Sequence, residues 1–221
     1  MKNLAIITVI LSTVFFTSCR KHALIGEGPI VNETRELPSF TSVAADGSVD
    51  VVVHPSNTNR AIVSGYGNLV PQYETEVNGN GRLRLKFRDK FINVRHNNIR
   101  VDVYTTGISS YSINGSGNTT IRQGMTTENM DLEINGSGDI HVEQNKFVNM
   151  NCKVNGSGNI HAQSCTTDHA NITISGSGNV KLAVLKTLSV RISGSGDVDY
   201  WGSPQITKMD VSGSGDIKKR D

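Results

Sequence analysis

The chain has 221 residues and a formal net charge of +2, which is enough for one domain or for two small domains that share a core. Only 5% of the residues are aromatic and 19% are charged, whereas glycine occurs 22 times. A nearly neutral chain without a basic cluster lacks the electrostatic attraction on which phosphate binding depends, so we predict no nucleic-acid partner. Abundant Gly, Ser, Asn, Val and Ile favour short strands and tight turns over a helical enzyme core.

Residues 1–18 have the pattern of an export signal. Lys2 precedes an almost wholly apolar run that ends at Phe16, and this run is too short to span a bilayer comfortably. It is followed by Thr17-Ser18-Cys19. Small residues directly before a Cys are typical of a bacterial lipobox, although Phe16 stands where Leu is usual. We predict a lipoprotein signal peptide with lipidation at Cys19; an ordinary signal peptide with an incidental Cys is the alternative.

Acyl chains on Cys19 would anchor the protein, because each buried methylene contributes about 0.8 kcal/mol to membrane binding. Residues 19–37 are polar and contain Gly26, Gly28 and Pro29, a composition that predicts a flexible tether. We therefore expect a lipid-anchored protein of the cell envelope at the outer membrane, on a membrane face that the sequence leaves open.

A Gly-Ser-Gly repeat dominates the rest of the chain. It recurs six times at intervals of 18 to 21 residues, each time after Asn or Ser and before Asn or Asp. We assign these glycines to structural turns, because sharp corners need positive φ at one or two positions. They are Gly115, Gly117, Gly136, Gly138, Gly156, Gly158, Gly176, Gly178, Gly194, Gly196, Gly213 and Gly215.

Apolar residues alternate on both sides of every turn, as half-buried strands require. Near-identical spacing and residue columns predict an all-β, single-stranded parallel β-helix (β-solenoid) over residues 111–217, with about 20 residues per coil. Right-handed coils are our default by analogy with other parallel β-helices, and a meander of hairpins is the alternative fold. The residues after each turn should stack into a ladder: Asn118, Asp139, Asn159, Asn179, Asp197 and Asp216.

Residues 38–110 are strand-like but less regular. We expect this segment to cap the N-terminal end of the solenoid, because an open end exposes unpaired backbone groups. Two stretches look like degenerate copies of the turn, Ala45–Val49 and Val77–Gly81. At the other end, Lys218 to Asp221 supply charges that discourage pairing of an edge strand.

A lipobox, an irregular β segment and recurring Ile-Asn-Gly-Ser-Gly-Asp/Asn coils resemble the putative auto-transporter adhesin family with the head GIN domain. The resemblance covers roughly residues 38–216, and the copies at Ile113–Asn118, Ile134–Asp139 and Val154–Asn159 fit best. It implies an exported β-helical protein of Bacteroidetes-type bacteria without an established enzymatic activity. It supplies no catalytic residues.

We predict no metal site and no cofactor. Gly-Ser-Gly-Asp turns are similar to those of calcium-binding β-rolls, but half of the expected ladder is Asn and calcium needs six to eight oxygen ligands. His141 and His161 should lie side by side on adjacent coils, with Glu143 on the same face. These three residues are the candidates for zinc, although an exposed polar face produces such neighbours by chance.

Cys152 and Cys165 remain after lipidation of Cys19, and an exported protein meets an oxidising compartment. The sequence leaves open whether they form a disulfide or stay as two buried thiols. On the outside, Glu133 with Lys153, and Arg191 with Asp210, should form ion pairs of a solvated face.

No Ser or Cys has a partnered His, and the outward positions show no cluster of acids and bases, so we assign no catalytic residue. The preferred hypothesis is a non-enzymatic adhesin or surface-binding module whose partners are the membrane, through its anchor, and a glycan or a host or matrix protein. A carbohydrate-active β-helix enzyme and a self-associating scaffold, that is, a homo-oligomer, are the alternatives.

Overall fold

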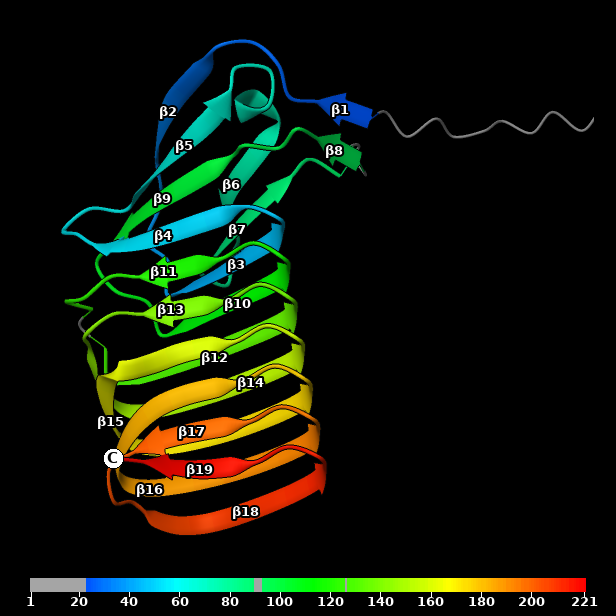
Figure 1. Cartoon of the computed structure of the whole chain (residues 1–221). Helices are drawn as coiled ribbons and strands as arrows, with labels where there is room; N and C mark the ends of the chain where they lie inside the picture. The colour runs from blue at the N-terminus through cyan, green and yellow to red at the C-terminus, as the bar shows by residue number, and fades with distance from the viewer. Residues whose placement is uncertain (1–22, 90–92, 126) are drawn as a thin grey trace, which may run out of the picture.

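The structure is a computed structural model that describes residues 23–89, 93–125 and 127–221 (Figure 1). Each coil of the repeat, from β10 onward, has a strand that enters a Gly-Ser-Gly corner, a strand that leaves it, and a segment that returns to the next coil. Signal peptide and Cys19 lie outside the described residues.

The entering strands form a parallel sheet that we call the first wall. Its members are β3 (Ser42–Gly47), β7 (Arg82–Phe87), β10 (Ser110–Gly115), β12 (Asn129–Gly136), β14 (Lys146–Gly156), the later parts of β15 (Ile160–Gly176) and β16 (Val180–Gly194), and β18 (Gln205–Gly213).

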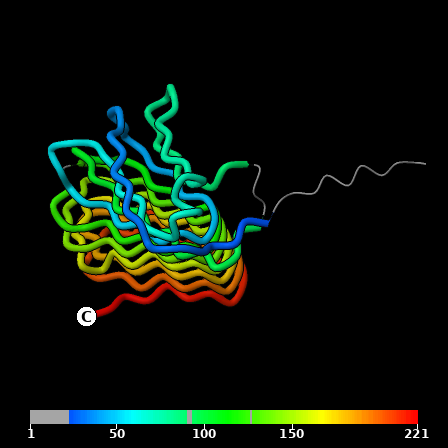
Figure 2. Tube along the Cα trace, turned by 90° about the horizontal axis from the view of Figure 1, so that it is seen from above, coloured from blue at the N-terminus to red at the C-terminus, as the bar shows by residue number. Residues whose placement is uncertain are grey.

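The leaving strands form the second wall, which is also parallel. Its members are β4 (Asp50–Pro55), β9 (Arg100–Thr105), β11 (Thr119–Ile121), β13 (Ile140–Val142), the first residues of β15 and β16, β17 (Val198–Trp201) and β19 (Ile217–Arg220). Viewed down the stack, the coils overlie one another (Figure 2).

The register of the walls confirms the predicted solenoid and excludes a meander of hairpins. Strands of successive coils run parallel, and equivalent repeat positions are opposed: Gly136 pairs with Gly156, and Gly156 with Gly176. The inward columns therefore stack residue on residue. Ile134, Val154 and Ile174 are each fully buried, so every coil covers the core of the coil before it.

The two glycines of each corner have different physical reasons. The first has positive φ in every copy, for example +136° at Gly156, where a Cβ is strained. The second has no such φ, but a Cβ on Gly158 would overlap the carbonyl of Gly138 on the preceding coil. Backbone bonds hold this close approach: the N–H groups of Ser157 and Gly158 both donate to the carbonyl of Gly136, at 2.9 and 3.2 Å.

The predicted polar ladder is confirmed next to the corners. Each side-chain oxygen accepts the backbone N–H of the equivalent residue on the following coil. Asp139 N–H donates to Asn118 Oδ1 at 3.1 Å, and Asn159 N–H donates to Asp139 Oδ1 at 2.7 Å. The ladder begins one coil earlier than predicted, because Asn118 N–H donates to Asp50 Oδ1 at 2.9 Å. The side chains thus satisfy corner N–H groups that no strand would pair.

The N-terminal end of the stack is covered by strands of opposite direction. β5 (Arg60–Tyr66) pairs antiparallel with β9, and β2 (Ile30–Glu36) pairs antiparallel with β5. β6 (Tyr73–Val77) forms an antiparallel hairpin with β7, after the short 3-10 helix η1 (Val70–Gln72). The short parallel pair β1 (Ala23–Ile25) and β8 (Asn93–Arg95) lies beside this end.

Stacking order and chain order differ here. β7 and β9 stack on β3 and β4, which in turn stack on β10 and β11. The coil that comes second in the sequence is therefore first in space. The chain must then pass back beneath the earlier coil before the regular repeat begins.

Three expectations for this region have different outcomes. Ala45–Val49 is a true corner, because Gly47 pairs with Gly115. The reading of Val77–Gly81 as a corner is wrong: it is the turn of the β6–β7 hairpin, in which Asn78 Oδ1 accepts the N–H groups of Asn80 and Arg82. The prediction of a flexible tether over residues 19–37 is wrong for residues 23–37, which the structure describes, because β1 and β2 are hydrogen-bonded strands of the cap.

Both remaining cysteines are free and buried. Cys165 Sγ donates to the carbonyl of Glu143 at 3.0 Å. Burial is the main cause that raises the pKa of Cys152 to about 12 and that of Cys165 to about 11. The structure thus has two protonated core thiols.

Alanine in place of a corner glycine should destabilise the fold in a graded way. Gly158→Ala adds one buried overlap, which should lower the free energy of unfolding by about 1–3 kcal/mol. Gly156→Ala adds a similar overlap and also backbone strain of about 1–3 kcal/mol, so it should lower stability more. Gly79→Ala is the matched control, since nothing lies within 4 Å of its Cβ position. Urea unfolding followed by circular dichroism measures all three; equal effects at Gly79 and Gly158 would contradict the stacking argument.

The cysteines should be unreactive in the folded protein. We expect residues 20–221, purified without reductant, to show no thiol reaction with Ellman's reagent at pH 8 and two thiols per chain in guanidinium chloride. Because folding raises both thiol pKa values, unfolded thiols ionise first as the pH rises above their ordinary pKa of 9.0, so stability should fall there. No thiol in denaturant would instead indicate a disulfide.

Candidate binding surface

The outer side of the first wall carries an ordered array of seven carboxamide groups and one carboxylate, that of Asp131, which we call the amide face. These side chains occupy equivalent positions on neighbouring coils, so they lie side by side at the strand spacing of about 4.8 Å. The members are Asn114, Asn129, Asp131, Asn135, Asn149, Asn151, Asn155 and Asn171. Seven of them are exposed, and Asn155 is half-buried.

Hydrogen bonds between coils hold the amide face in order. Asn135 Nδ2 donates to Asn114 Oδ1 at 3.0 Å, and Asn155 Nδ2 donates to Asn135 Oδ1 at 2.8 Å. Two further rows repeat the pattern on the same strands: Asn149 Nδ2 donates to Asn129 Oδ1 at 2.8 Å, and Asn151 Nδ2 donates to Asp131 Oδ1 at 2.6 Å. The amide planes are therefore fixed before any ligand arrives.

Each amide in such a row keeps bonding capacity to spare. A carboxamide has two N–H donors and two acceptor lone pairs, and the central Asn135 uses one of each within its row. One donor and one acceptor of Asn135 therefore remain for a ligand. A surface of this kind suits hydroxyl groups, because each hydroxyl both donates and accepts.

Charged residues of the first wall pair with one another, as predicted. Lys153 Nζ lies 2.9 Å from Glu133 Oε1, and Arg191 Nε lies 3.4 Å from Asp210 Oδ2. Both pairs link neighbouring coils on the exposed side. Such pairs contribute little to stability, but they leave the first wall without unpaired charge at these positions.

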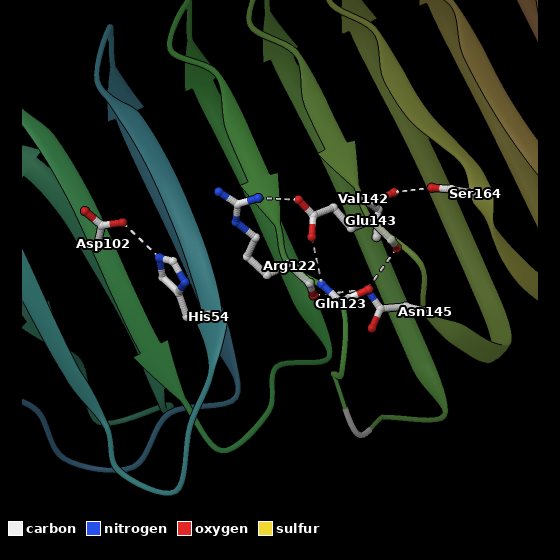
Figure 3. Close-up of polar contacts among 8 residues, drawn as sticks. All are labelled: His54, Asp102, Arg122, Gln123, Val142, Glu143, Asn145 and Ser164. Atoms are coloured by element: carbon white, nitrogen blue, oxygen red, sulfur yellow. Dashed lines mark hydrogen bonds and ion pairs between the residues drawn. The ribbon is translucent and has the colours of Figure 1, made fainter.

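On the second wall, His54 is the centre of a cluster that the sequence did not reveal. Its Nε2 lies 2.8 Å from Asp102 Oδ1, as Figure 3 shows, and its ring stacks on Tyr104 at 4.7 Å. The guanidinium of Arg60 lies 4.2 Å from the Tyr104 centroid. Because β4 and β5 flank β9 on opposite sides, both faces of the tyrosine ring are covered and unavailable for sugar stacking.

Glu143 belongs to a second cluster of this wall. Its carboxylate forms an ion pair with Arg122 and accepts the N–H of Gln123 at 3.2 Å (Figure 3). Desolvation raises the pKa of Glu143, but the bonds from Arg122 and Gln123 outweigh it and hold the pKa below its ordinary value. The carboxylate is therefore ionised and engaged, which does not suit a general acid.

Asn145, at the end of the same cluster, is structural. This buried side chain accepts the N–H groups of Gly124 and Met125, at 3.0 and 2.8 Å, and donates to the carbonyls of Arg122 and Glu143, at 3.1 and 3.0 Å. It uses both donors and both lone pairs. Asn145 therefore shapes the return segment and leaves nothing for a ligand.

The three candidate zinc ligands are only partly brought together. His141 and His161 lie side by side, with ring centroids 6.3 Å apart, whereas Glu143 is held by Arg122. Desolvation, with Lys181 and His141, lowers the pKa of His161 despite Asp139. Within the described ranges, no group of three or more His, Cys, Asp or Glu side chains is arranged to hold a metal ion.

The second wall thus offers paired rather than free carboxylates. Besides Asp102 and Glu143, Asp199 Oδ1 lies 2.8 Å from Arg220 Nε. Glycoside hydrolysis needs a raised-pKa acid and a second carboxylate on either side of the scissile bond. Asp102, Glu143 and Asp199 each have a cationic or histidine partner instead.

The amide rows had a signal in the sequence: Asn or Asp recurs at equivalent positions of successive repeats, next to the apolar residues that face the core. The His54 cluster had none, because β4, β5 and β9 come from the irregular segment.

Across the part of the chain that the structure describes, no helix is long and apolar enough to cross a membrane.

Three solved structures illustrate the likeness of this fold to known proteins. A putative adhesin from Bacteroides fragilis superposes with a TM-score of 0.69 at 19% identity, over 89% of this chain and 100% of its own. A putative adhesin and a putative lipid binding protein, both from Parabacteroides distasonis, give TM-scores of 0.57 and 0.56 at 16% and 22% identity; each match covers 90% of this chain and 100% of the other.

At these identities, the structural likeness establishes the fold alone. A search of curated proteins found no match. A family model, described as putative auto-transporter adhesin, head GIN domain, matches residues 39–204, which is most of the chain and spans both walls. The protein therefore belongs to the putative auto-transporter adhesin, head GIN domain family.

Proposed function

We propose that the protein is a non-enzymatic, lipid-anchored envelope protein that binds a hydroxyl-rich polymer, such as a polysaccharide, along its amide face. The observation that carries this proposal is the ordered rows of exposed carboxamides on the first wall. Its support from the comparisons is coarser: the family and two of the structural relatives bear the name putative adhesin.

Periodicity favours a polymer over a small ligand. Equivalent amides repeat once per coil over two or three neighbouring coils, so a ligand with its own repeat could contact several of them at once. Each contact alone is a solvent-exposed hydrogen bond of about 0.5–1.5 kcal/mol. Several contacts on one rigid face add avidity without any deep pocket, which suits adhesion to a surface or matrix.

A non-enzymatic role fits the chemistry of both walls. The carboxylates of Glu133, Asp102 and Glu143 are engaged by cations or histidine, and the pKa of Glu143 is lowered rather than raised. A glycoside hydrolase of the usual kind needs one carboxylic acid with a raised pKa and a second carboxylate opposite it. The pairing of these residues therefore supports binding without cleavage.

Membrane attachment is supported by the sequence. The apolar run before Thr17-Ser18-Cys19 favours export and lipidation of Cys19, and several acyl chains would provide a stable anchor. The described chain begins at the capped end of the solenoid with β1 and β2. A Cys19 anchor would therefore attach this end to the membrane and leave the C-terminal end distant from it.

Binding should be measured first on an array of polysaccharides and matrix proteins, using residues 20–221, with product analysis of each bound polysaccharide. We expect saturable binding of an intact polysaccharide. The triple variant Asn129→Ala/Asn149→Ala/Asn151→Ala should then lower the affinity roughly tenfold or more, because three hydrogen-bonding groups are lost.

The matched control is His141→Ala/His161→Ala/Lys181→Ala, which removes three neighbouring side chains from the outer side of the second wall. Circular dichroism confirms that both triple variants fold. Equal loss of affinity in both would argue against the amide face. Binding to a matrix protein but to no polysaccharide would show that the ligand is a protein and contradict the proposed polysaccharide ligand. Cleaved polysaccharide would overturn the non-enzymatic assignment.

Lipidation should be tested on the full chain in a bacterial host. Wild type should incorporate labelled palmitate and fractionate with membranes, whereas Cys19→Ala should lose the label, because the acylated thiol is absent. Cys165→Ala is the matched control and should keep the label, since its thiol is buried. Label retained by Cys19→Ala would contradict the anchor.

A further inference from the structure

The two ends of the solenoid are treated differently by the fold. At the N-terminal end, β2, β5 and β6 close the stack with antiparallel pairing. At the C-terminal end, β18 pairs on one side with β16, and β19 pairs on one side with β17. Within the described chain, nothing lies over the other edge of these two strands (Figure 1).

The open end exposes residues that belong to the core columns. Ile206, Met209 and Val211 are opposite Leu188, Val190 and Ile192, which are buried. Their own exposed fractions are 39%, 46% and 42%. The last coil therefore presents an apolar row together with the free backbone groups of β18, which is a ready template for another strand.

The two halves of this open edge are not equivalent. On β19, the inward position after Ile217 is Lys219, which is opposite the buried Tyr200 and whose Nζ donates to Ser203 Oγ at 3.2 Å. Lys218 and Arg220 add further charge on this strand, a common way to block edge pairing. The apolar half formed by β18 has no charged inward residue, and its one irregularity is a register shift at Thr207.

The sequence of β18 is complementary to itself in one antiparallel register. When Met209 is opposite Met209 of a second copy, each Lys208 is opposite the other copy's Asp210, and Val211 is opposite Thr207. Shifting the centre to Lys208 or Asp210 places like charges opposite each other, and centring on Val211 pairs neither charge. Only the register centred on Met209 pairs both charges.

We propose that this end is a self-association surface, at which β18 pairs antiparallel with β18 of a second copy in the register centred on Met209. A two-fold axis through the Met209 pair generates this arrangement, so the interface is closed and stops at a dimer. The interaction buries Met209 and Val211. It also places each Lys208 opposite the other copy's Asp210, which lies 3.4 Å from Arg191 and 3.9 Å from Lys208 of its own chain. It goes beyond the proposed function, because it does not depend on the ligand of the amide face.

Charge reversal provides the decisive test, using sedimentation velocity of residues 20–221, which include every residue that the structure describes. Wild type should show a concentration-dependent monomer–dimer equilibrium. Lys208→Asp and Asp210→Lys should each weaken dimerisation at least tenfold, because like charges then face each other. The double variant Lys208→Asp/Asp210→Lys should restore it, because the pairing is re-formed with exchanged signs.

Crosslinking tests the register independently. Met209→Cys should form a disulfide-linked dimer under mild oxidation, since residue 209 faces its own copy. Val211→Cys is the matched control: it has a similar exposure but faces Thr207, so it should stay monomeric on a non-reducing gel. A wild-type monomer at all concentrations, a dimer insensitive to charge reversal, or equal crosslinking at both positions would each overturn the proposal.

Discussion

Successive coils approach most closely at the Gly-Ser-Gly corners, and the rest of the structure depends on that approach. The carbonyls of Gly47, Gly115, Gly136, Gly156 and Gly176 each accept two N–H groups from the next coil, and that of Gly194 accepts one. No side chain fits between such corners. Because the corners fix the spacing, the inward columns stack without a gap and the outward columns form continuous rows.

The polar ladder and the amide face follow from this spacing. At the ladder, a side-chain oxygen such as Asp139 Oδ1 accepts a main-chain N–H of the next coil, so the residue stabilises the corner itself. On the amide face, Asn149 and Asn151 bond only to other side chains. The two sets look alike in the sequence, but the first holds the fold together and the second is free to evolve toward a ligand.

Sequence periodicity predicted the solenoid, its corners and its ladder because those features repeat, and each copy repeats the same physical constraint. It led us to expect a cap over residues 38–110 but not the topology of that segment, in which the chain visits its coils out of order and β5 and β6 reverse direction. Asn78 shows the difficulty: its turn resembles a corner in composition, yet its side chain closes a hairpin. The His54–Asp102 pair likewise depends on the pairing of β4 with β9, which no repeat reveals.

The column pattern also predicts burial of Met209 and Val211, but both are exposed, because no further coil of the described chain covers them. Their exposure has a geometric consequence if β18 pairs with itself. Because the two-fold axis of an antiparallel pair can stand normal to the sheet, the first walls of both copies would join into one sheet. Their amide faces would point to the same side, which doubles the rows available to a polymer and raises avidity without any change in the single contacts.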